Sequence, residues 1–139
     1  MERNHFMSYI ASFNARDFEA MRKYWSDEVE LELPPDREGN RRILRGPDSI
    51  IASYTRLFGY VREHLEIDYL AMDQDRIACE MGTTFEAIED HPDFAAQPLR
   101  KGDVFIMNNF VHFDLQDGLF HRIRVARYTQ DASGIRAGN

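Results

Sequence analysis

The spacing of hydrophobic positions changes along the chain, from a helical repeat in the first half to a strand repeat after about residue 65. The first predicted helix carries on one face Phe6, Tyr9, Ile10 and Phe13. Asp17 is a suitable N-cap for a second helix, from Phe18 to about Trp25. The segment 46–58 begins with Gly-Pro-Asp and predicts a third helix. Three short helices are therefore expected before most of the strands.

Alternation of apolar and polar residues predicts one strand early and four later in the chain, at 29–33, 65–72, 76–88, 103–115 and 119–128. The segments between them are turns and loops, and the polar stretches 34–45 and 89–102 are the longest of these. Helices followed by an antiparallel meander predict an α+β fold, in which a strongly bent sheet wraps around the helices. Residues 130–139 are small and polar and are expected to form a flexible tail.

Composition narrows the class of protein. The 139 residues include 24 acidic and 17 basic side chains, a net charge of −7, which argues against a nucleic-acid or membrane partner. Cys79 is the only cysteine, so neither an intrachain disulfide nor a paired-thiolate metal site is expected. The first residues lack the apolar core of a signal peptide, and no stretch is long enough for a membrane span, so a cytoplasmic protein is expected.

Four stretches carry a resemblance to a known family: YIASFNARDFEAMRKYWSDEVELELP, GPDSIIASY, FDLQDGLFHRIRV, and the long strand before the Asp-Gly turn. Over residues 5–128 the chain resembles the nuclear transport factor 2-like superfamily, in its ketosteroid-isomerase and SnoaL-like polyketide-cyclase branch. The resemblance implies a cone-shaped roll, with three N-terminal helices packed on a strongly bent, mostly antiparallel sheet. It also implies a single domain over residues 1–129 and a homodimer formed through the outer sheet face.

One catalytic residue of the family has a counterpart in this chain, and others have none. Tyr9 matches the tyrosine that donates a hydrogen bond to the substrate oxygen in the isomerases. The proton-shuttling aspartate of those enzymes falls at Leu33 here, and their second acid falls at or near Val111. An aspartate of the epoxide-hydrolase branch would fall near Val125. Isomerisation of steroids by the family's own pair of acids is therefore not expected.

The same match gives an inward-facing set of strand residues, which a shift of one position would exchange for the outward set. Asn109 is the polar member of an otherwise apolar inward strand, so it must meet a polar neighbour, a water or a ligand. His112 and Asp114 share the outer face. Together with helix residues, the expected pocket lining is Phe13, Trp25, Leu33, Tyr54, Phe58, Met81, Thr83, Phe85, Met107, Val111, Phe113, Ile123, Val125 and Arg127. The loops 34–45 and 89–102 are expected to rim its mouth.

Two functions fit these residues. In the first, the protein is a cofactor-free and metal-free isomerase, cyclase or dehydratase that acts by proton transfer on a small apolar oxygenated molecule. Tyr9 would be the acid or oxyanion donor with help from Asn109, and the base would be His121 or a bound water. In the second, the domain only binds a ligand or forms a dimer. Tyr9 itself has two interpretations, a donor that faces the pocket or a core aromatic whose hydroxyl meets backbone or water. An ionisable side chain with a perturbed pKa in the cavity would favour the enzyme.

Overall fold

A computed structural model describes the backbone of residues 1–136 and the side chains of residues 1–130. The helices are α1 (Arg3–Asn14), α2 (Phe18–Arg22) and α3 (Pro47–Leu57). The strands are β1 (Trp25–Leu33), β2 (Arg42–Arg45), β3 (Val61–Met72), β4 (Arg76–Ala87), β5 (Asp103–Gln116) and β6 (Leu119–Arg136). They form one sheet in the order β2-β1-β6-β5-β4-β3, in which β1 and β6 run parallel and the other pairs antiparallel. The predicted α+β class, with three helices on a bent, mostly antiparallel sheet, is confirmed.

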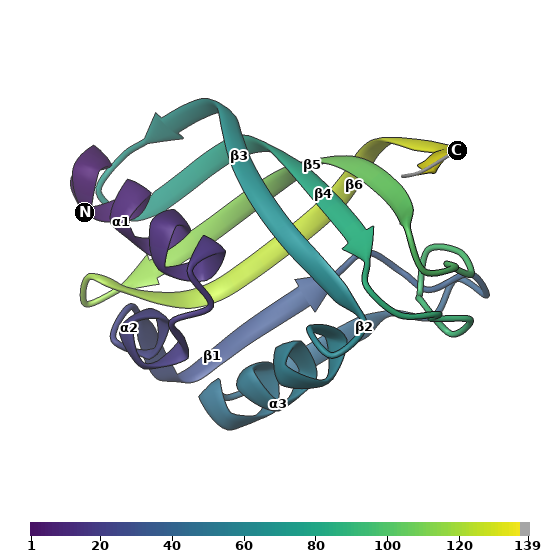
Figure 1. The fold of residues 1–139 in the computed structure, drawn as a ribbon. Coiled ribbons are helices and arrows are strands. Elements are labelled where there is room, and N and C mark those ends of the chain that lie inside the picture. The colour runs from purple at the N-terminus through teal and green to yellow at the C-terminus, as the bar shows by residue number, and fades with distance from the viewer. Residues whose placement is uncertain (137–139) are drawn as a thin grey trace.

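The helices lie within the curve of the sheet (Figure 1): α1 packs against β3, and α3 packs against β1 and β2. Breaks in register, one between β3 and β4 and three between β5 and β6, bend the long strands, as β-bulges do. Phe6 of α1 is fully buried and meets Phe113 and Phe120 of the sheet edge-on, at ring distances of 5.1 and 6.3 Å. The apolar face of α1 therefore closes one end of the roll.

Three boundaries differ from the sequence prediction. Helix α2 ends at Arg22, so Trp25 is the first residue of β1 and not the end of a helix. There Trp25 pairs with Phe120, a contact across 95 residues that local helical spacing cannot reveal. The expected loop 34–45 contains β2, which pairs with the end of β1. Strand β3 starts at Val61, four residues before the predicted start, because it pairs with β4 along its whole length.

The C-terminal strand also runs further than expected. β6 continues to Arg136, where it pairs with the start of β5, beyond the predicted domain end at residue 129. Residues 137–139 of the predicted tail lie outside the described residues. The flexibility of this segment stays a prediction. No helix in the described part of the chain is long and apolar enough to cross a membrane.

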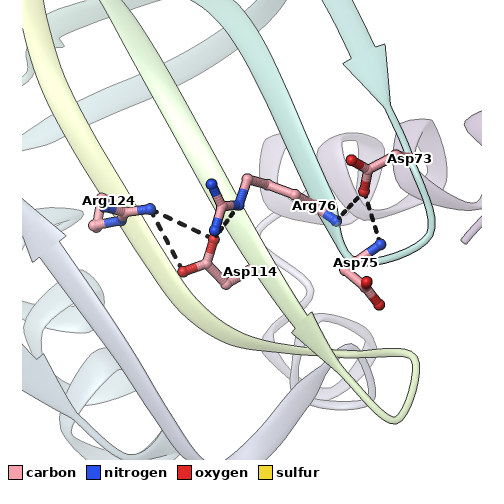
Figure 2. Close-up of polar contacts among 5 residues, drawn as sticks. All are labelled: Asp73, Asp75, Arg76, Asp114 and Arg124. Carbon is pink, nitrogen blue, oxygen red and sulfur yellow. Dashed lines mark hydrogen bonds and ion pairs between the residues drawn. The ribbon is translucent and has the colours of Figure 1, made fainter.

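Charged side chains on the outer face of the sheet are joined in ion pairs (Figure 2). Asp114 of β5 accepts from Arg76 of β4 at 3.1 Å and lies 3.5 Å from Arg124 of β6. In the adjacent turn, the Asp73 carboxylate accepts the backbone N–H groups of Asp75 and Arg76, both at 2.8 Å. Three strands are thus joined across this face by a single carboxylate.

Candidate active site

A cavity of about 580 Å³ lies between the helices and the concave side of the sheet. Its wall is mostly apolar, which is typical of sites for small organic molecules. From the residues expected to form the site, the wall includes Tyr9, Phe13, Trp25, Leu33, Tyr54, Met81, Thr83, Phe85, Met107, Asn109, Val111, Phe113, Ile123, Val125 and Arg127.

Two of the expected residues lie elsewhere. Phe58 stacks on Tyr54 and Phe18 behind the wall, because the helix that carries it turns away at Leu57. His121 is near the start of β6, where its Nδ1 atom lies 3.4 Å from the Ser26 hydroxyl. His121 is not among the residues that line the cavity, and its role as the base stays a prediction.

Tyr9 contributes a phenol to the cavity wall. Its ring meets Phe113 and Phe120 edge-on, and its oxygen accepts a hydrogen bond from Trp25 Nε1 at 3.2 Å. Because indole nitrogen only donates, this bond leaves the phenol proton free, and no acceptor for it exists in the described part of the chain. Burial raises the pKa of Tyr9, while the Trp25 hydrogen bond lowers it. Tyr9 is therefore a neutral donor near neutral pH.

Asn109 is the second neutral polar group of the cavity. It is buried on β5, and its Oδ1 atom has no hydrogen-bond partner among the described residues. An unmet buried acceptor costs about 1–3 kcal/mol. The cavity beside it can supply a donor from a ligand or a water, which is the role that the sequence suggested for this residue.

Glu63 is the cavity residue that sequence analysis missed. It lies on β3, is 9% exposed, and has no hydrogen-bond partner in the described part of the chain. Burial raises the pKa of this carboxyl to about 8, and the positive charge of Arg16 only partly opposes the effect. An ionisable group with this pKa in a cavity is the feature expected of an enzyme that transfers protons.

The alternation in the segment VREHLEI could have revealed Glu63, since it places this carboxyl on the same face as Val61 and Leu65. The prediction began the strand at Leu65 and so left Glu63 at the end of the preceding helix. Periodicity alone marks the start of a strand poorly, because an acidic residue on the buried face interrupts the apolar pattern.

The turn after α1 holds Glu63 in position. The Asn14 side chain donates to the carbonyl oxygen of Leu65 at 3.0 Å and accepts from its N–H at 2.8 Å, so it fixes the free edge of β3. Two residues later Arg16 adopts a left-handed φ of 57° and lies 4.0 Å above the Phe58 ring. From this position, the positive charge of Arg16 lowers the pKa of the Glu63 carboxyl. In the NARD sequence, Asn14 thus fixes the backbone of β3, and the charge of Arg16 acts on the Glu63 carboxyl from outside the cavity.

Arg42 and Arg127 bring positive charge to the cavity wall near its loops. Arg42 Nε donates to the Pro34 carbonyl at 2.7 Å, and both burial and the charge of Arg127 lower the pKa of Arg42. Tyr54 also lines the cavity. Burial raises its pKa most, with smaller contributions from Glu63 and Tyr9, while Arg42 lowers it.

Both long loops contribute to the mouth. Pro34 and residues 91–96 line the cavity, and Arg37 donates to the Pro92 carbonyl at 3.5 Å, which joins the loops. Phe94 is buried against Phe85, at a ring distance of 5.0 Å. The loops therefore rim the cavity as expected, while their greater mobility stays a prediction.

Across the described residues, no three His, Cys, Asp or Glu side chains lie close enough together to hold a metal ion. The groups that the cavity wall offers to a ligand include phenols, carboxyls, an amide and guanidinium groups. These groups can donate hydrogen bonds, pair with an anion and move a proton.

Comparison with known proteins gives one family and many related structures. The family model described as "SnoaL-like domain" matches residues 7–123. No curated protein sequence matches the chain. A proposed polyketide cyclase from Xanthomonas campestris pv. campestris has a similar structure, with a TM-score of 0.70 and 22% identity over 89% of this chain and 87% of that one.

Two further structures are similar at lower identity. An LEH-like epoxide hydrolase from M. tuberculosis has a TM-score of 0.63 and 14% identity, over 88% of this chain and 79% of that one. A computationally designed 17-OHP binder has a TM-score of 0.67 and 15% identity, over 91% and 92% of the two chains. At these identities the likeness establishes the fold alone.

Proposed function

Because the chain belongs to the SnoaL-like domain family, we propose that it is a cofactor-free isomerase, cyclase or dehydratase acting by proton transfer. Its substrate is a small, largely apolar molecule that carries one or two oxygens and fits a cavity of about 580 Å³. The observation that carries the proposal is the unpaired Glu63 carboxyl in the cavity wall.

Glu63 is the proton-transfer group. With a pKa of about 8, this carboxyl accepts and releases protons near neutral pH with little cost. Only about a tenth of the molecules carry an ionised Glu63 at pH 7, because that pH lies one unit below the pKa. A step in which Glu63 removes a proton is therefore accelerated as the pH rises toward 8.

Tyr9 is the donor to the substrate oxygen. As the Glu63 carboxylate takes a proton from a carbon next to a carbonyl, negative charge moves onto the carbonyl oxygen, and the Tyr9 O–H stabilises it. Trp25 donates to the phenol oxygen and so strengthens the phenol as a donor. Glu63 then returns the proton to another carbon of the same substrate, or to the oxygen formed by ring closure. The proton count is balanced in both cases.

This arrangement replaces the two acids that the chain lacks. Leu33 and Val111 stand at the positions expected for carboxylates, and both line the cavity as apolar residues. The carboxyl comes from β3 instead, on the opposite edge of the sheet from β1 and β2. Catalysis from this new position is consistent with the same chemistry but gives the substrate a different orientation.

A ligand-binding module is the alternative function. The apolar wall and the fold shared with a designed 17-OHP binder favour it. In such a module, Glu63 would remain protonated and donate a hydrogen bond to the ligand. Loss of Glu63 would then change affinity and leave no reaction to be lost.

The test is a pH profile of turnover on cyclisable polyketides and conjugated enones, with the wild type and Glu63→Gln. We expect kcat/KM of the wild type to rise with pH, to be half-maximal near pH 8 and to level off about one pH unit higher, and Glu63→Gln to lower it about 10²- to 10⁴-fold. Glu66→Gln is the matched control, because Glu66 is an exposed acid on the same strand. Equal turnover by Glu63→Gln and the wild type would reject the mechanism, and binding without turnover would support the alternative.

We also propose that the protein forms a homodimer through the outer sheet face and resides in the cytoplasm. Phe110 and Tyr128 are 42% and 64% exposed there, with rings stacked at 4.8 Å. Exposed paired aromatics of this kind are typical of protein interfaces. Ala126, which pairs with Phe110, leaves room beside them for a second subunit.

A further inference from the structure

The arginines that form ion pairs in the described part of the chain all lie outside the cavity. Outside the cavity, Arg41 binds Glu32 at 2.9 Å, Arg22 binds Asp48 at 2.8 Å, and Arg76 binds Asp114 at 3.1 Å. No carboxylate lies within ion-pair distance of Arg42 or Arg127 among the described residues. Most other arginines without an ion pair are exposed to water, whereas Arg42 and Arg127 are partly buried in the cavity wall.

The two guanidinium groups come from strands on either side of β1. Arg42 of β2 pairs in register with Leu33, while β6, which carries Arg127, runs along the other side of β1. Both line the same cavity and repel each other. Two like charges held in one apolar cavity cost free energy, unless an anion joins them.

The hydrogen-bonding capacity of both groups is incompletely used. Arg127 Nε is buried and has no partner among the described residues. Arg42 uses Nε on the Pro34 carbonyl, so its two terminal nitrogens remain available. Asp36, the acid whose charge acts on Arg42, already accepts the N–H groups of Glu38 and Asn40, both at 2.9 Å. The Asp36 carboxylate therefore hydrogen-bonds to its own loop and not to the Arg42 guanidinium.

We propose that Arg42 and Arg127 form a subsite for a carboxylate, so that the substrate is an apolar acid with its reacting oxygen directed toward Tyr9. The proposal rests on the proposed function for the location of the reaction and adds the class of substrate. A carboxylate matches the planar fork of a guanidinium and carries one charge. Glu63 in the same cavity repels any anion when it is ionised, and it repels a dianion such as a phosphate more strongly than a carboxylate with one charge.

Equilibrium binding tests the subsite without requiring turnover. The probes are 2-naphthoate, methyl 2-naphthoate and 2-naphthyl phosphate, titrated by calorimetry at pH 7. We expect the wild type to bind 2-naphthoate at least about tenfold more tightly than the ester, as a charge-assisted hydrogen bond requires. Arg127→Gln and Arg42→Gln each reduce that ratio, and Arg127→Lys restores part of it.

The matched control is Arg124→Gln, since Arg124 lies on the same strand but pairs with Asp114 on the outer face. We expect Arg124→Gln to keep the wild-type ratio of the affinities for 2-naphthoate and its methyl ester. Equal affinity for acid and ester, absence of binding by the acid, or tighter binding of the phosphate would each overturn the proposal. Glu63→Gln is expected to keep the preference for the acid, so failure of the proton-transfer mechanism and failure of the subsite give different results.

Discussion

Charged side chains have opposite surroundings on the two faces of the sheet. On the outer face, Asp114 joins Arg76 and Arg124, and these groups remain partly in contact with water (Figure 2). On the inner face, Glu63 and Arg127 are enclosed by apolar side chains and lack ion pairs among the described residues. The outer ion pairs are partly exposed and contribute little stability, whereas burial raises the pKa of the inner Glu63 carboxyl to about 8. Function is therefore to be sought where charges are enclosed and unpaired.

The largest effect is expected on the pH dependence of stability. Glu63 has a raised pKa in the folded state, so its contribution to stability is fully present below about pH 4.5 and is lost as the pH rises to about 8. Each pKa unit corresponds to about 1.4 kcal/mol, which makes the loss a few kcal/mol.

Glu63→Gln removes this dependence. In urea unfolding, we expect the variant to lose less free energy of unfolding than the wild type between pH 4.5 and 8, while the exposed control Glu66→Gln follows the wild type. If the free energy of unfolding changed with pH in the same way for the wild type and Glu63→Gln, the Glu63 carboxyl would ionise normally in the folded protein.

The second prediction concerns the apolar part of the outer face. Phe110→Glu places a charge at the centre of the proposed dimer interface, next to Tyr128. We expect dimer dissociation to become at least about 30-fold more favourable, since an interface hot spot contributes about 2 kcal/mol or more. Sedimentation at tens of micromolar measures this. A wild type that is already monomeric would contradict the dimer, and Glu80→Gln beside Phe110 is the control.

The third prediction returns to the cavity. Tyr9→Phe removes the phenol donor and keeps the ring that packs on Phe113 and Phe120. Turnover should fall by about 10- to 100-fold with the fold intact, which corresponds to about 1–3 kcal/mol of barrier. Tyr24→Phe is the matched control, because Tyr24 contacts Tyr9 but does not line the cavity. If the protein only binds its ligand, Tyr9→Phe should weaken oxygenated ligands by about 1 kcal/mol and leave apolar ones unaffected.

The smallest effect belongs to the outer ion pairs. Asp114→Asn removes the carboxylate shared by Arg76 and Arg124, but these side chains stay solvated. We expect a loss of less than about 1 kcal/mol in the free energy of unfolding, reduced further by salt. A loss of several kcal/mol in thermal or urea unfolding would mean that the outer charges are as important as the inner ones, and the contrast between the faces would fail.

The sequence predicted elements best where one periodic pattern ran without interruption. The long strands β4 and β5 alternate over their whole length, and the expected inward residues Met81, Met107 and Val111 are buried. Strand β2 was missed, since RILR is too short and too charged to stand out from its loop. Its partner β1 supplies the pairing that makes it a strand. Trp25 was assigned to a helix because its contact with Phe120 is distant in sequence.

Sequence reasoning named most of the residues that line the cavity but not its carboxyl. Tyr9 was named through the family resemblance, and Asn109 because it interrupts the apolar face of a predicted strand. Glu63 was missed because its strand begins two residues before it, whereas the predicted strand began two residues after it. Its perturbed pKa arises from burial by residues from several elements, which no local pattern encodes.

The central claim is that the Glu63 carboxyl titrates near pH 8, and NMR measures this directly. The carboxyl carbon of Glu63, labelled with ¹³C and assigned by its loss in Glu63→Gln, is followed from pH 4 to pH 10. We expect a single titration of this carboxyl with a midpoint near 8. A Glu63 midpoint between about 4 and 5, the ordinary range of a glutamate, would contradict the account.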